Sequence, residues 1–386
     1  MSVRVVIGAD LVPTESNYTL FKDGDAEKLF GIELLKSLNE MDFRIFNLET
    51  PLIDKNNSIL KYGASLRAPL NTINGFKSIN VDFLTLANNH IMDQGIEGLK
   101  STKTILNNNS IDFSGVGDNI RDARRPYVKV IKGIKIGIYC CAEHEFSIAT
   151  DSFPGANPYD PLTSFDDVKE LSNNCNFTIV LYHGGKELYR YPSPNLQRVF
   201  RKFAESGAKL VIAQHTHCIG CMEEYFGSML IYGQGNFLFD HSDDDFRKTS
   251  LLVSASIDPF SFSATYSFIP IVKHSNTIQM ASTSESNEIL KAFYERSSLI
   301  LNKDFVHQKY AELAQKNKSS VFLALSGKMG NVRFKRLLNK ITNYKYIENN
   351  YSSDSTMLKL LNMLNCETHY ELALYIFKRL YNNSSK

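Results

Sequence analysis

The sequence contains no run of about 18 consecutive apolar residues, the length that a helix needs to cross a membrane, and this excludes a transmembrane helix. Residues 1–10 read directly into a β-type run, so we expect no secretory signal ahead of the fold. The six cysteines, in a chain that we do not expect to be secreted, argue for free thiols rather than a disulfide framework. Internal repeats and long low-complexity tracts are also absent. We therefore expect a globular, cytoplasmic protein.

The composition is ordinary, but the charge is unevenly spread. With 386 residues, 43% of them hydrophobic and 22% charged, the chain can bury a large core, and we expect one large domain with an appendage. Residues 285–386 hold 16 Lys and Arg against 9 Asp and Glu, a net of +7, whereas residues 1–284 carry a net of −5. An acidic first part suits a cation site and a basic tail suits an anionic partner, although solvated helix faces give the same numbers.

Strands and helices alternate over the first 240 residues. Short apolar and β-branched runs predict strands, and longer segments with apolar residues at helical spacing predict helices. The predicted strands span 3–7, 43–46, 83–86, 134–141, 177–182, 210–213 and 229–232, and the predicted helices span 26–38, 95–106 and 196–206. This alternation implies a single open, largely parallel sheet covered on both faces. Farther along we predict two antiparallel strands over 251–257 and 264–272, a polar linker over 275–286, and helices from about residue 287.

The predicted strands end in side chains that can bind a metal ion. The stretch 83–95, for example, runs from an apolar strand into Asn88, Asn89, His90 and Asp93, at the edge where open α/β sheets bind ligands. Taken one at a time, these residues have ordinary explanations, because Asn and Asp cap helices and form turns. A lone buried histidine is commonly a satisfied core residue. The strand-end residues are Asp10, Glu49, Asn89 with His90, His183, and His215 with His217.

The pair His215 and His217 is a stronger signal than any single residue. Alternate residues of an extended backbone point to the same face, so the two imidazoles can share one site. Oxygen and nitrogen ligands at successive strand ends resemble a two-metal site, and a mixture of carboxylate and imidazole suits Mn, Fe or Zn. We therefore predict two divalent transition-metal ions as cofactors.

Several motifs, in chain order, resemble those of a known family. They are Gly8-Ala9-Asp10, Asn47-Leu48-Glu49, Ala-Asn-Asn-His-Ile-Met-Asp-Gln-Gly at 87–95, His-Gly-Gly-Lys-Glu at 183–187, Gln-His-Thr-His at 214–217 and Gly-Asn-Phe at 235–237. Together they resemble the CapA (poly-γ-glutamate/capsule biosynthesis) family of the calcineurin-like metallophosphatase superfamily over residues 3–270. The resemblance implies an α/β fold with a β-sandwich flanked by helices, which replaces the single open sheet. We expect this domain over residues 1–275 and a basic, helical region over 285–386.

The resemblance also implies a role for each motif residue. Six residues would hold the metals: Asp10 and His217 the first, Glu49 as a bridge to both, and Asn89, His183 and His215 the second. His90 would be the general acid beside the leaving group, and Asp93 would orient its imidazole. In such a site two metals activate a bridging hydroxide for attack at phosphorus, and His90 protonates the departing alkoxide.

Two positions depart from the pattern. Phosphatases of the superfamily usually carry a histidine two positions after the first aspartate, where this chain has Val12. This departure bears on how fully the first metal position is occupied. The common His-Trp-Gly of the family is His183-Gly184-Gly185 here, and the chain contains no Trp. The second departure leaves the ligands intact but alters the floor near the substrate.

Other residues are weaker candidates. Four are candidates for substrate binding: Arg67, Asn88, Glu187 and Asn236. Arg67 is either a clamp on an anionic substrate or an ordinary surface arginine. Cys218 and Cys221 could suggest a zinc knuckle or a redox pair, but a single pair lacks partners and we interpret both as structural thiols. Glu143-His144-Glu145 follows a strand and could line the pocket.

Two classes of function fit these signals. The first is a metal-dependent phosphoesterase or related hydrolase that acts on a phosphorylated or anionic compound in capsule, exopolysaccharide or polyglutamate biosynthesis. The second is a non-hydrolytic, metal-containing component that binds polymer or serves the assembly of a surface-polymer system. The His90–Asp93 pair favours the enzyme. We expect no nucleic-acid partner, and peripheral contact with a membrane or a biosynthetic complex is an open alternative.

The basic tail generates a first prediction. Residues 328–345 contain six basic residues and no acidic one, with Phe334, Leu337, Leu338 and Ile341 at helical spacing. The hypothesis to test is that this amphipathic helix binds an anionic polymer or membrane surface, in which case the binding weakens as salt rises. Co-sedimentation with anionic vesicles at low and high salt tests this, with neutral vesicles as the control. Binding that is absent or indifferent to salt leaves the alternative, a helix packed on the catalytic domain with its lysines in water.

Overall fold

The structure is a computed structural model that describes residues 2–240, 244–325 and 333–351, together with Met357, Leu360, Leu364 and Phe377. The chain divides into two compact units, Met1–Val306 and His307–Lys386. All strands within the described ranges belong to the first unit.

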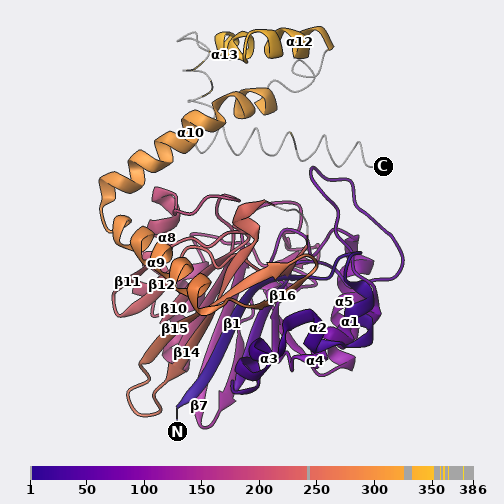
Figure 1. Ribbon diagram of the computed structural model, residues 1–386, viewed down its shortest axis with the longest axis vertical. Coiled ribbons are helices and arrows are strands. Elements are labelled where there is room, and N and C mark those ends of the chain that lie inside the picture. Colours follow the sequence, from indigo (N-terminus) through magenta and orange to yellow (C-terminus); the bar gives the residue numbers. More distant parts are fainter. Residues whose placement is uncertain are drawn as a thin grey trace. The chain divides into compact units, whose positions relative to one another are not determined.

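The first unit contains a sheet of eight strands (Figure 1). The strands are β1 (Val3–Val12), β2 (Phe43–Leu48), β3 (Phe83–Thr85), β4 (Asp112–Ser114), β13 (Asn236–Phe239), β14 (Thr249–Ile257), β15 (Ala264–His274) and β16 (Thr277–Met280). Their order is β16–β15–β14–β1–β2–β3–β4, and β13 pairs in parallel with the end of β1. β1 to β4 are parallel to one another. β14 and β15 are antiparallel, which confirms that prediction.

A second sheet of six strands faces the first. It consists of β6 (Tyr127–Ile131), β7 (Ile134–Ala142), β9 (Phe177–His183), β10 (Leu210–Gln214), β11 (Met222–Tyr225) and β12 (Ser228–Ile231), in the order β11–β12–β10–β9–β7–β6. The four central strands are parallel, and the two edge strands are antiparallel to their neighbours. A small third sheet pairs β5 (Val116–Gly117) with β8 (Gly155–Ala156).

Helices follow most of the parallel strands. They are α1 (Tyr18–Asp23), α2 (Ala26–Phe30), α3 (Ile32–Asn39), α4 (Ile73–Ser78), α5 (Gly95–Asn108), α6 (Ile120–Ala123), α7 (Ser164–Asn174), α8 (Pro194–Glu205) and α9 (Thr283–Leu299), with short 3₁₀ turns η1 (Leu70–Thr72) and η2 (Asp245–Arg247). Their ends have local causes. Ser193 caps α8 by accepting a hydrogen bond from the Leu196 amide, and Ser282 with Glu285 forms a capping box at α9.

The hydrophobic core lies in three layers that define a sandwich. Because successive residues of a strand face opposite sides, β1 directs Val5 and Ile7 toward the second sheet and Val6 toward the helices. In the layer between the sheets, Val5 and Ile7 belong to the same apolar cluster as Ile136 and Ile179 of the second sheet. The outer faces are covered by α1 to α5 on one side and by α7 and α8 on the other. The structure therefore confirms the β-sandwich flanked by helices.

Two predicted elements differ from the structure. The single helix predicted over 26–38 is two helices, because Gly31 has a φ of 72° and ends α2. A left-handed backbone of this kind favours glycine and cannot continue a helix. The predicted linker over 275–286 instead contains the edge strand β16 and the first turn of α9. Ile278, buried in the outer core layer, anchors that strand.

The second unit is helical within the described ranges. The helix α10 (Lys303–Leu325) runs into it from the first unit, and α12 (Arg333–Ile341) and α13 (Lys345–Tyr351) follow. Leu337 and Ile341 of the predicted basic helix are 53% and 71% exposed. Lys328, at the start of that prediction, lies outside the described residues.

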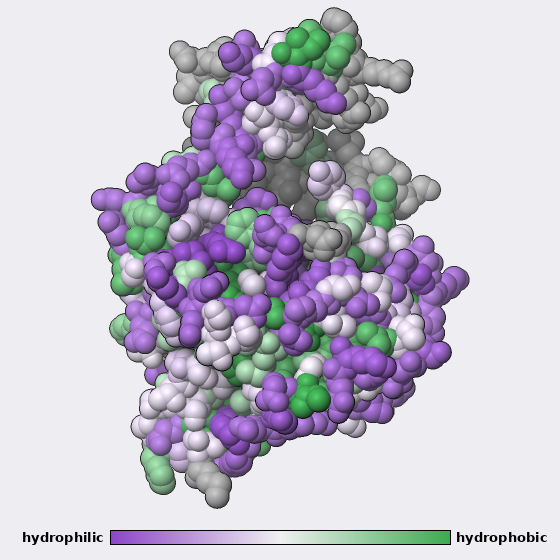
Figure 2. Space-filling view, viewed as in Figure 1, coloured by the Kyte–Doolittle hydropathy of each residue, from purple (hydrophilic) through white to green (hydrophobic). Residues whose placement is uncertain are grey.

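Polar side chains dominate the visible surface. Figure 2 shows hydrophilic residues, in purple, over much of this face, with hydrophobic residues in small separate groups. Among the helices of the described ranges, none combines the length and the apolar character that crossing a membrane requires.

The core generates a prediction about stability. Phe46 of β2 is fully buried, and its ring centroid lies 4.5 Å from the ring centroid of Phe237. Phe46→Ala should lower the free energy of unfolding by about 3–5 kcal/mol, because it leaves a cavity between the first sheet and its helices. Denaturant unfolding followed by circular dichroism measures the change. Phe260→Ala, at a side chain that is 90% exposed, is the control. Equal unfolding midpoints for the two variants would contradict this packing.

Candidate metal centre

The predicted metal ligands come together where strands of both sheets end. Asp10 lies near the end of β1, and Glu49 directly follows β2. His183 is the last residue of β9, and His215 and His217 follow β10. Because the strands that carry them are parallel within each sheet, their carboxyl ends meet at one edge of the sandwich. Ligand sites of α/β proteins occupy such edges.

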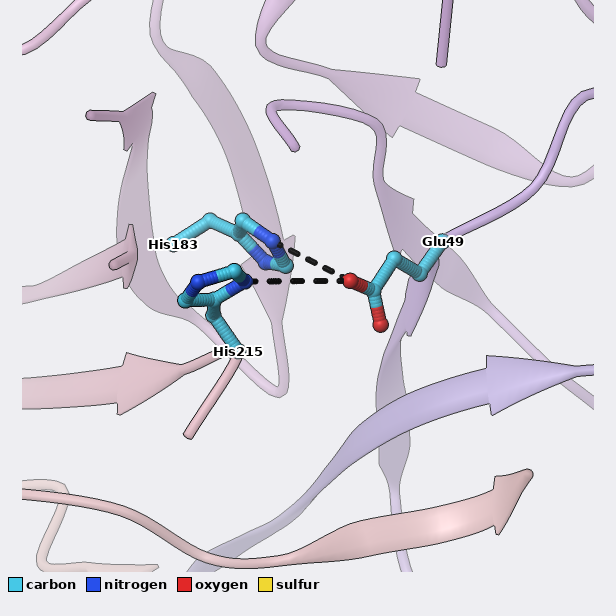
Figure 3. Close-up of side chains that lie close together, drawn as sticks. All are labelled: Glu49, His183 and His215. Atoms are coloured by element: carbon cyan, nitrogen blue, oxygen red, sulfur yellow. Dashed lines mark ion pairs between the residues drawn. The ribbon is translucent and has the colours of Figure 1, made fainter. Parts of the chain in front are cut away.

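Glu49 lies at the middle of this cluster. Its side chain is completely buried, and neither carboxylate oxygen makes a hydrogen bond to any residue that the structure describes. Two imidazoles lie nearby: Nε2 of His183 lies 3.3 Å and Nδ1 of His215 lies 3.9 Å from Oε1 of Glu49 (Figure 3). A buried carboxylate without hydrogen bonds is costly unless a cation pairs with it. The orphaned oxygens therefore fit a metal ligand.

Two groups of three residues can each hold a metal ion. In the first, Glu49, His183 and His215 bring one ligand atom apiece within 4.8 Å of one another. In the second, Asp10, Glu49 and His217 do the same. Glu49 belongs to both groups, so one carboxylate can serve two ions. Oxygen and nitrogen donors in this mixture suit divalent transition metals.

Asn89 reaches the first group from the loop after β3. Its Oδ1 lies 3.0 Å from Nε2 of His183, and its Nδ2 donates to Glu145 at 3.3 Å. Glu145 belongs to the Glu143-His144-Glu145 segment that the sequence suggested as a pocket lining. The amide oxygen therefore faces the imidazole that also faces Glu49.

Charges in the cluster shift the pKa values of its members. Burial raises the pKa of Glu49, but the nearby imidazoles of His183, His215 and His217 outweigh it and hold that pKa well below its usual value. Burial lowers the pKa of His215, but contact with Glu49 and the charges of Glu187 and Glu145 raise it to about 9. A bound metal requires neutral imidazoles, so it competes with protons for these nitrogens.

The backbone at the histidine pair differs from the prediction. His215 and His217 have φ values of 90° and 53°, so the extended backbone predicted for them is wrong. The two imidazoles enter different ligand groups, and these groups share Glu49. Residues without a glycine's freedom occupy this left-handed region at a cost, and such positions cluster at functional sites.

Three asparagines hold the cluster together. Asn47 donates to Oδ1 of Asp10 at 2.8 Å and lies 3.2 Å from Nδ1 of His183. Asn88 donates to Oδ1 of Asn47 at 3.1 Å and to the Leu48 carbonyl at 2.8 Å. Oδ1 of Asn236, on β13, lies 2.7 Å from Nδ1 of His217. The sequence marked Asn47 only as part of its motif, although it links a carboxylate of one sheet to an imidazole of the other.

A second polar group surrounds His90. Nδ1 of His90 lies 2.6 Å from Oδ2 of Asp93, and the backbone amide of Leu66 donates to the same oxygen at 2.6 Å. Nζ of Lys61 lies 2.5 Å from the other oxygen of Asp93 and 3.3 Å from Nδ1 of His90. The Lys61 side chain is only 3% exposed. No sequence pattern marks Lys61, because it lies 32 residues before Asp93 in a loop that carries no motif.

The remaining candidates lie in different places. Glu187 reaches the rim of the cluster, with Oε1 3.9 Å from Nε2 of His215. Arg67 is exposed and donates to the Asp54 carbonyl at 2.5 Å. Among the described contacts, it does not join the metal-binding groups. Cys218 and Cys221 are buried and free, and burial raises the pKa of both thiols.

A helix-flanked sandwich of two sheets, with residues that can hold a metal ion at the strand ends, is the architecture that the family resemblance implied. The family model described as "Bacterial capsule synthesis protein PGA_cap" matches residues 5–241. The chain belongs to this family, and the resemblance to the CapA motifs is thereby confirmed.

Curated relatives agree with the family. The chain is 27% identical over 216 residues to "PGA biosynthesis protein CapA" of Bacillus subtilis (strain 168), covering 55% of this chain and 57% of that protein. It is 26% identical over 212 residues to "Capsule biosynthesis protein CapA" of Bacillus anthracis, covering 53% and 52%. The chain thus spans about half the length of the curated relatives it matches.

Solved structures with a similar arrangement are more distant. One is a phosphatase from Mycoplasma pneumoniae, with a TM-score of 0.45 and 17% identity over 74% of this chain and 97% of that chain. Another is a 5′-nucleotidase precursor from Thermus thermophilus, with a TM-score of 0.38 and 13% identity over 83% of this chain and 59% of that chain.

The shared carboxylate generates a prediction about metal content. We expect roughly two transition-metal ions per chain, as in other two-metal sites. Glu49→Ala should lose both ions, because both groups need that carboxylate, whereas His217→Ala should lose about one. Elemental analysis of protein purified with supplied Mn, Fe or Zn measures this, with Glu97→Ala on α5 as the control. A wild-type content of zero would refute the site.

Proposed function

We propose that this protein is a metal-dependent phosphoesterase with a dinuclear centre in residues 1–275. The observation that carries the proposal is the buried, unbonded carboxylate of Glu49, which two ligand groups share. In this proposal Asp10 and His217 would hold the first ion, Glu49 would serve both, and Asn89, His183 and His215 would hold the second. The ions are Mn, Fe or Zn, because carboxylate, amide and imidazole donors suit these metals.

The chemistry divides between the ions and the protein. When bound, a pair of divalent ions supplies an activated water and neutralises the charge that develops at the phosphoryl group. The protein supplies the proton for the leaving group. Asp93 accepts the hydrogen bond of His90 Nδ1, which directs Nε2 outward as the proton donor and stabilises the imidazolium.

Lys61 strengthens this arrangement. Its ammonium group pairs with the second oxygen of Asp93 at 2.5 Å, so the carboxylate is held from two sides in a buried place. We propose that Lys61 and the Leu66 amide fix the position of Asp93, and that Asp93 in turn fixes the ring of His90. A ring held in one orientation delivers its proton along one direction.

The substrate is proposed from the family. The printed names of the relatives concern capsule and PGA biosynthesis. We propose a phosphorylated or anionic compound of capsule, exopolysaccharide or polyglutamate biosynthesis as the substrate. The His90–Asp93 pair supports hydrolysis over a purely polymer-binding role, because binding alone has no need of an oriented proton donor.

The proton donor generates a prediction that separates these two roles. His90→Asn should keep the fold and the metals while lowering turnover by about 10²–10⁴, the range for losing a general acid. The loss should shrink for nitrophenyl phosphates, whose leaving group departs without a proton. Asp93→Asn should show a milder loss, because that residue only orients the ring. Steady-state kinetics on alkyl and nitrophenyl esters measure both effects.

The control is His274→Asn, at an exposed histidine at the end of β15. It should leave turnover unchanged. If His90→Asn also leaves the best measured activity unchanged, that activity does not use this acid, and the non-hydrolytic role in polymer assembly becomes the better proposal.

A further inference from the structure

Three arginines gather beside the segment that follows His217. We call them the arginine cluster: Arg190 in the loop after β9, Arg247 at the end of η2, and Arg296 on α9. Arg190 and Arg296 line one cavity, and the guanidinium of Arg190 lies over Phe246, the residue next to Arg247. Segments that are far apart in the sequence therefore direct positive charge to one place.

Two of these arginines are held by groups that do not neutralise them. The guanidinium of Arg190 lies over the ring of Phe246, 4.5 Å from its centroid. Arg296 donates from Nε to the Gly220 carbonyl at 2.9 Å and from Nη2 to the Ile219 carbonyl at 3.4 Å. Burial, and then the charge of Arg190, lowers the pKa of Arg296. The two cations therefore repel each other, and an anion between them would relieve that repulsion.

The cluster also contains donors without partners. Nε of Arg190 and Nη1 of Arg247 are buried and make no hydrogen bond to any residue that the structure describes. Arg247 is 8% exposed, and its ion pair with Oε2 of Glu187 is long, at 4.0 Å. Buried donors are nearly always bonded. Guanidinium groups left in this state fit the paired oxygens of a carboxylate or a phosphate.

A cavity next to the cluster has room for such a group. It has a volume of about 200 Å³, and Arg190, Arg296 and Thr249 contribute its polar lining together with the exposed Glu288. Ile219, which also lines it, lies two residues after His217. Glu187 contacts both Arg247 and His215. Short segments therefore connect the cavity to the metal centre.

We propose that the arginine cluster is a subsite for a second anionic group of the substrate, a carboxylate or a phosphate. This inference rests on the proposed function and specifies its substrate class. The preferred substrate is a phosphate ester that carries a further negative charge on the same chain, as a segment of an anionic polymer does, rather than a simple monoester. The metal centre takes the ester phosphate, and the arginines take the neighbouring charge.

Binding of phosphonates that the protein cannot hydrolyse tests this. Methylphosphonate has one anionic group, phosphonoacetate adds a carboxylate, and methylenebisphosphonate adds a second phosphonate. Calorimetry on the metal-loaded full chain should show that the two-group probes bind about tenfold or more tightly than methylphosphonate, the gain expected from a charged hydrogen-bonded contact. Whichever of the two probes gains more affinity over methylphosphonate tells whether the subsite prefers a carboxylate or a phosphate.

Variants assign the preference to the cluster. Arg190→Gln should bring the affinity ratio close to one, and Arg190→Lys should keep part of it, because the charge remains but the planar fork is lost. Arg121→Gln, at an exposed arginine of α6, makes the same charge change and should keep the full ratio. Melting temperatures of all variants report whether the fold is intact.

The outcomes separate this inference from the proposed function. An affinity ratio near one in the unaltered protein overturns the subsite, even if the protein hydrolyses esters. An affinity ratio that stays at the unaltered value in both Arg190→Gln and Arg190→Lys overturns it as well. A protein that hydrolyses no ester but shows the ratio and its loss in Arg190→Gln keeps the subsite and loses the phosphoesterase. The readout is binding, so neither result depends on turnover.

Discussion

The buried carboxylate of Glu49 is the constraint on which the site depends. It has no hydrogen bond from any described residue, and two imidazoles lie 3.3 and 3.9 Å from one of its oxygens. Burying an ion in this way is costly, and a partner cation is what offsets the cost. The positions of His183, His215, Asp10 and His217 follow from that need, because each brings a donor to the same small volume.

The sandwich makes this convergence possible. Asp10 and Glu49 come from the first sheet and the histidines from the second, so the apolar layer between the sheets sets the spacing of the ligands. Asn47 links Asp10 to His183 across the same interface. The strained backbone at His215 and His217 is tolerated because the surrounding structure holds it. Stability of the core and geometry of the site are therefore coupled.

Positive charge around the centre is of two kinds. Lys61 is paired with Asp93 at 2.5 Å, and Asp93 in turn lies 2.6 Å from Nδ1 of His90. The arginine cluster is different, because two of its nitrogens are buried without partners among the described residues. A cation that is paired within the protein stabilises the fold around it. A buried donor without a partner can instead form a hydrogen bond with a ligand, and that bond contributes to the ligand's binding free energy. The acidic first part of the sequence conceals this local excess of positive charge.

The sequence by itself determined the alternation of strands and helices and the candidate ligand residues, because hydrophobic periodicity and ordered motifs are local properties of a chain. The prediction of a sandwich rested on the resemblance to the family motifs, because hydrophobic periodicity alone indicated a single open sheet. Only the tertiary structure decided that Glu49 is shared by two groups, that His215 and His217 leave the extended backbone, and that β16 occupies the predicted linker. Lys61 and the arginine cluster likewise carry no motif. They become part of the site only when the folded chain brings distant segments into contact, and side-chain pairs of this kind leave no periodic signal in the sequence.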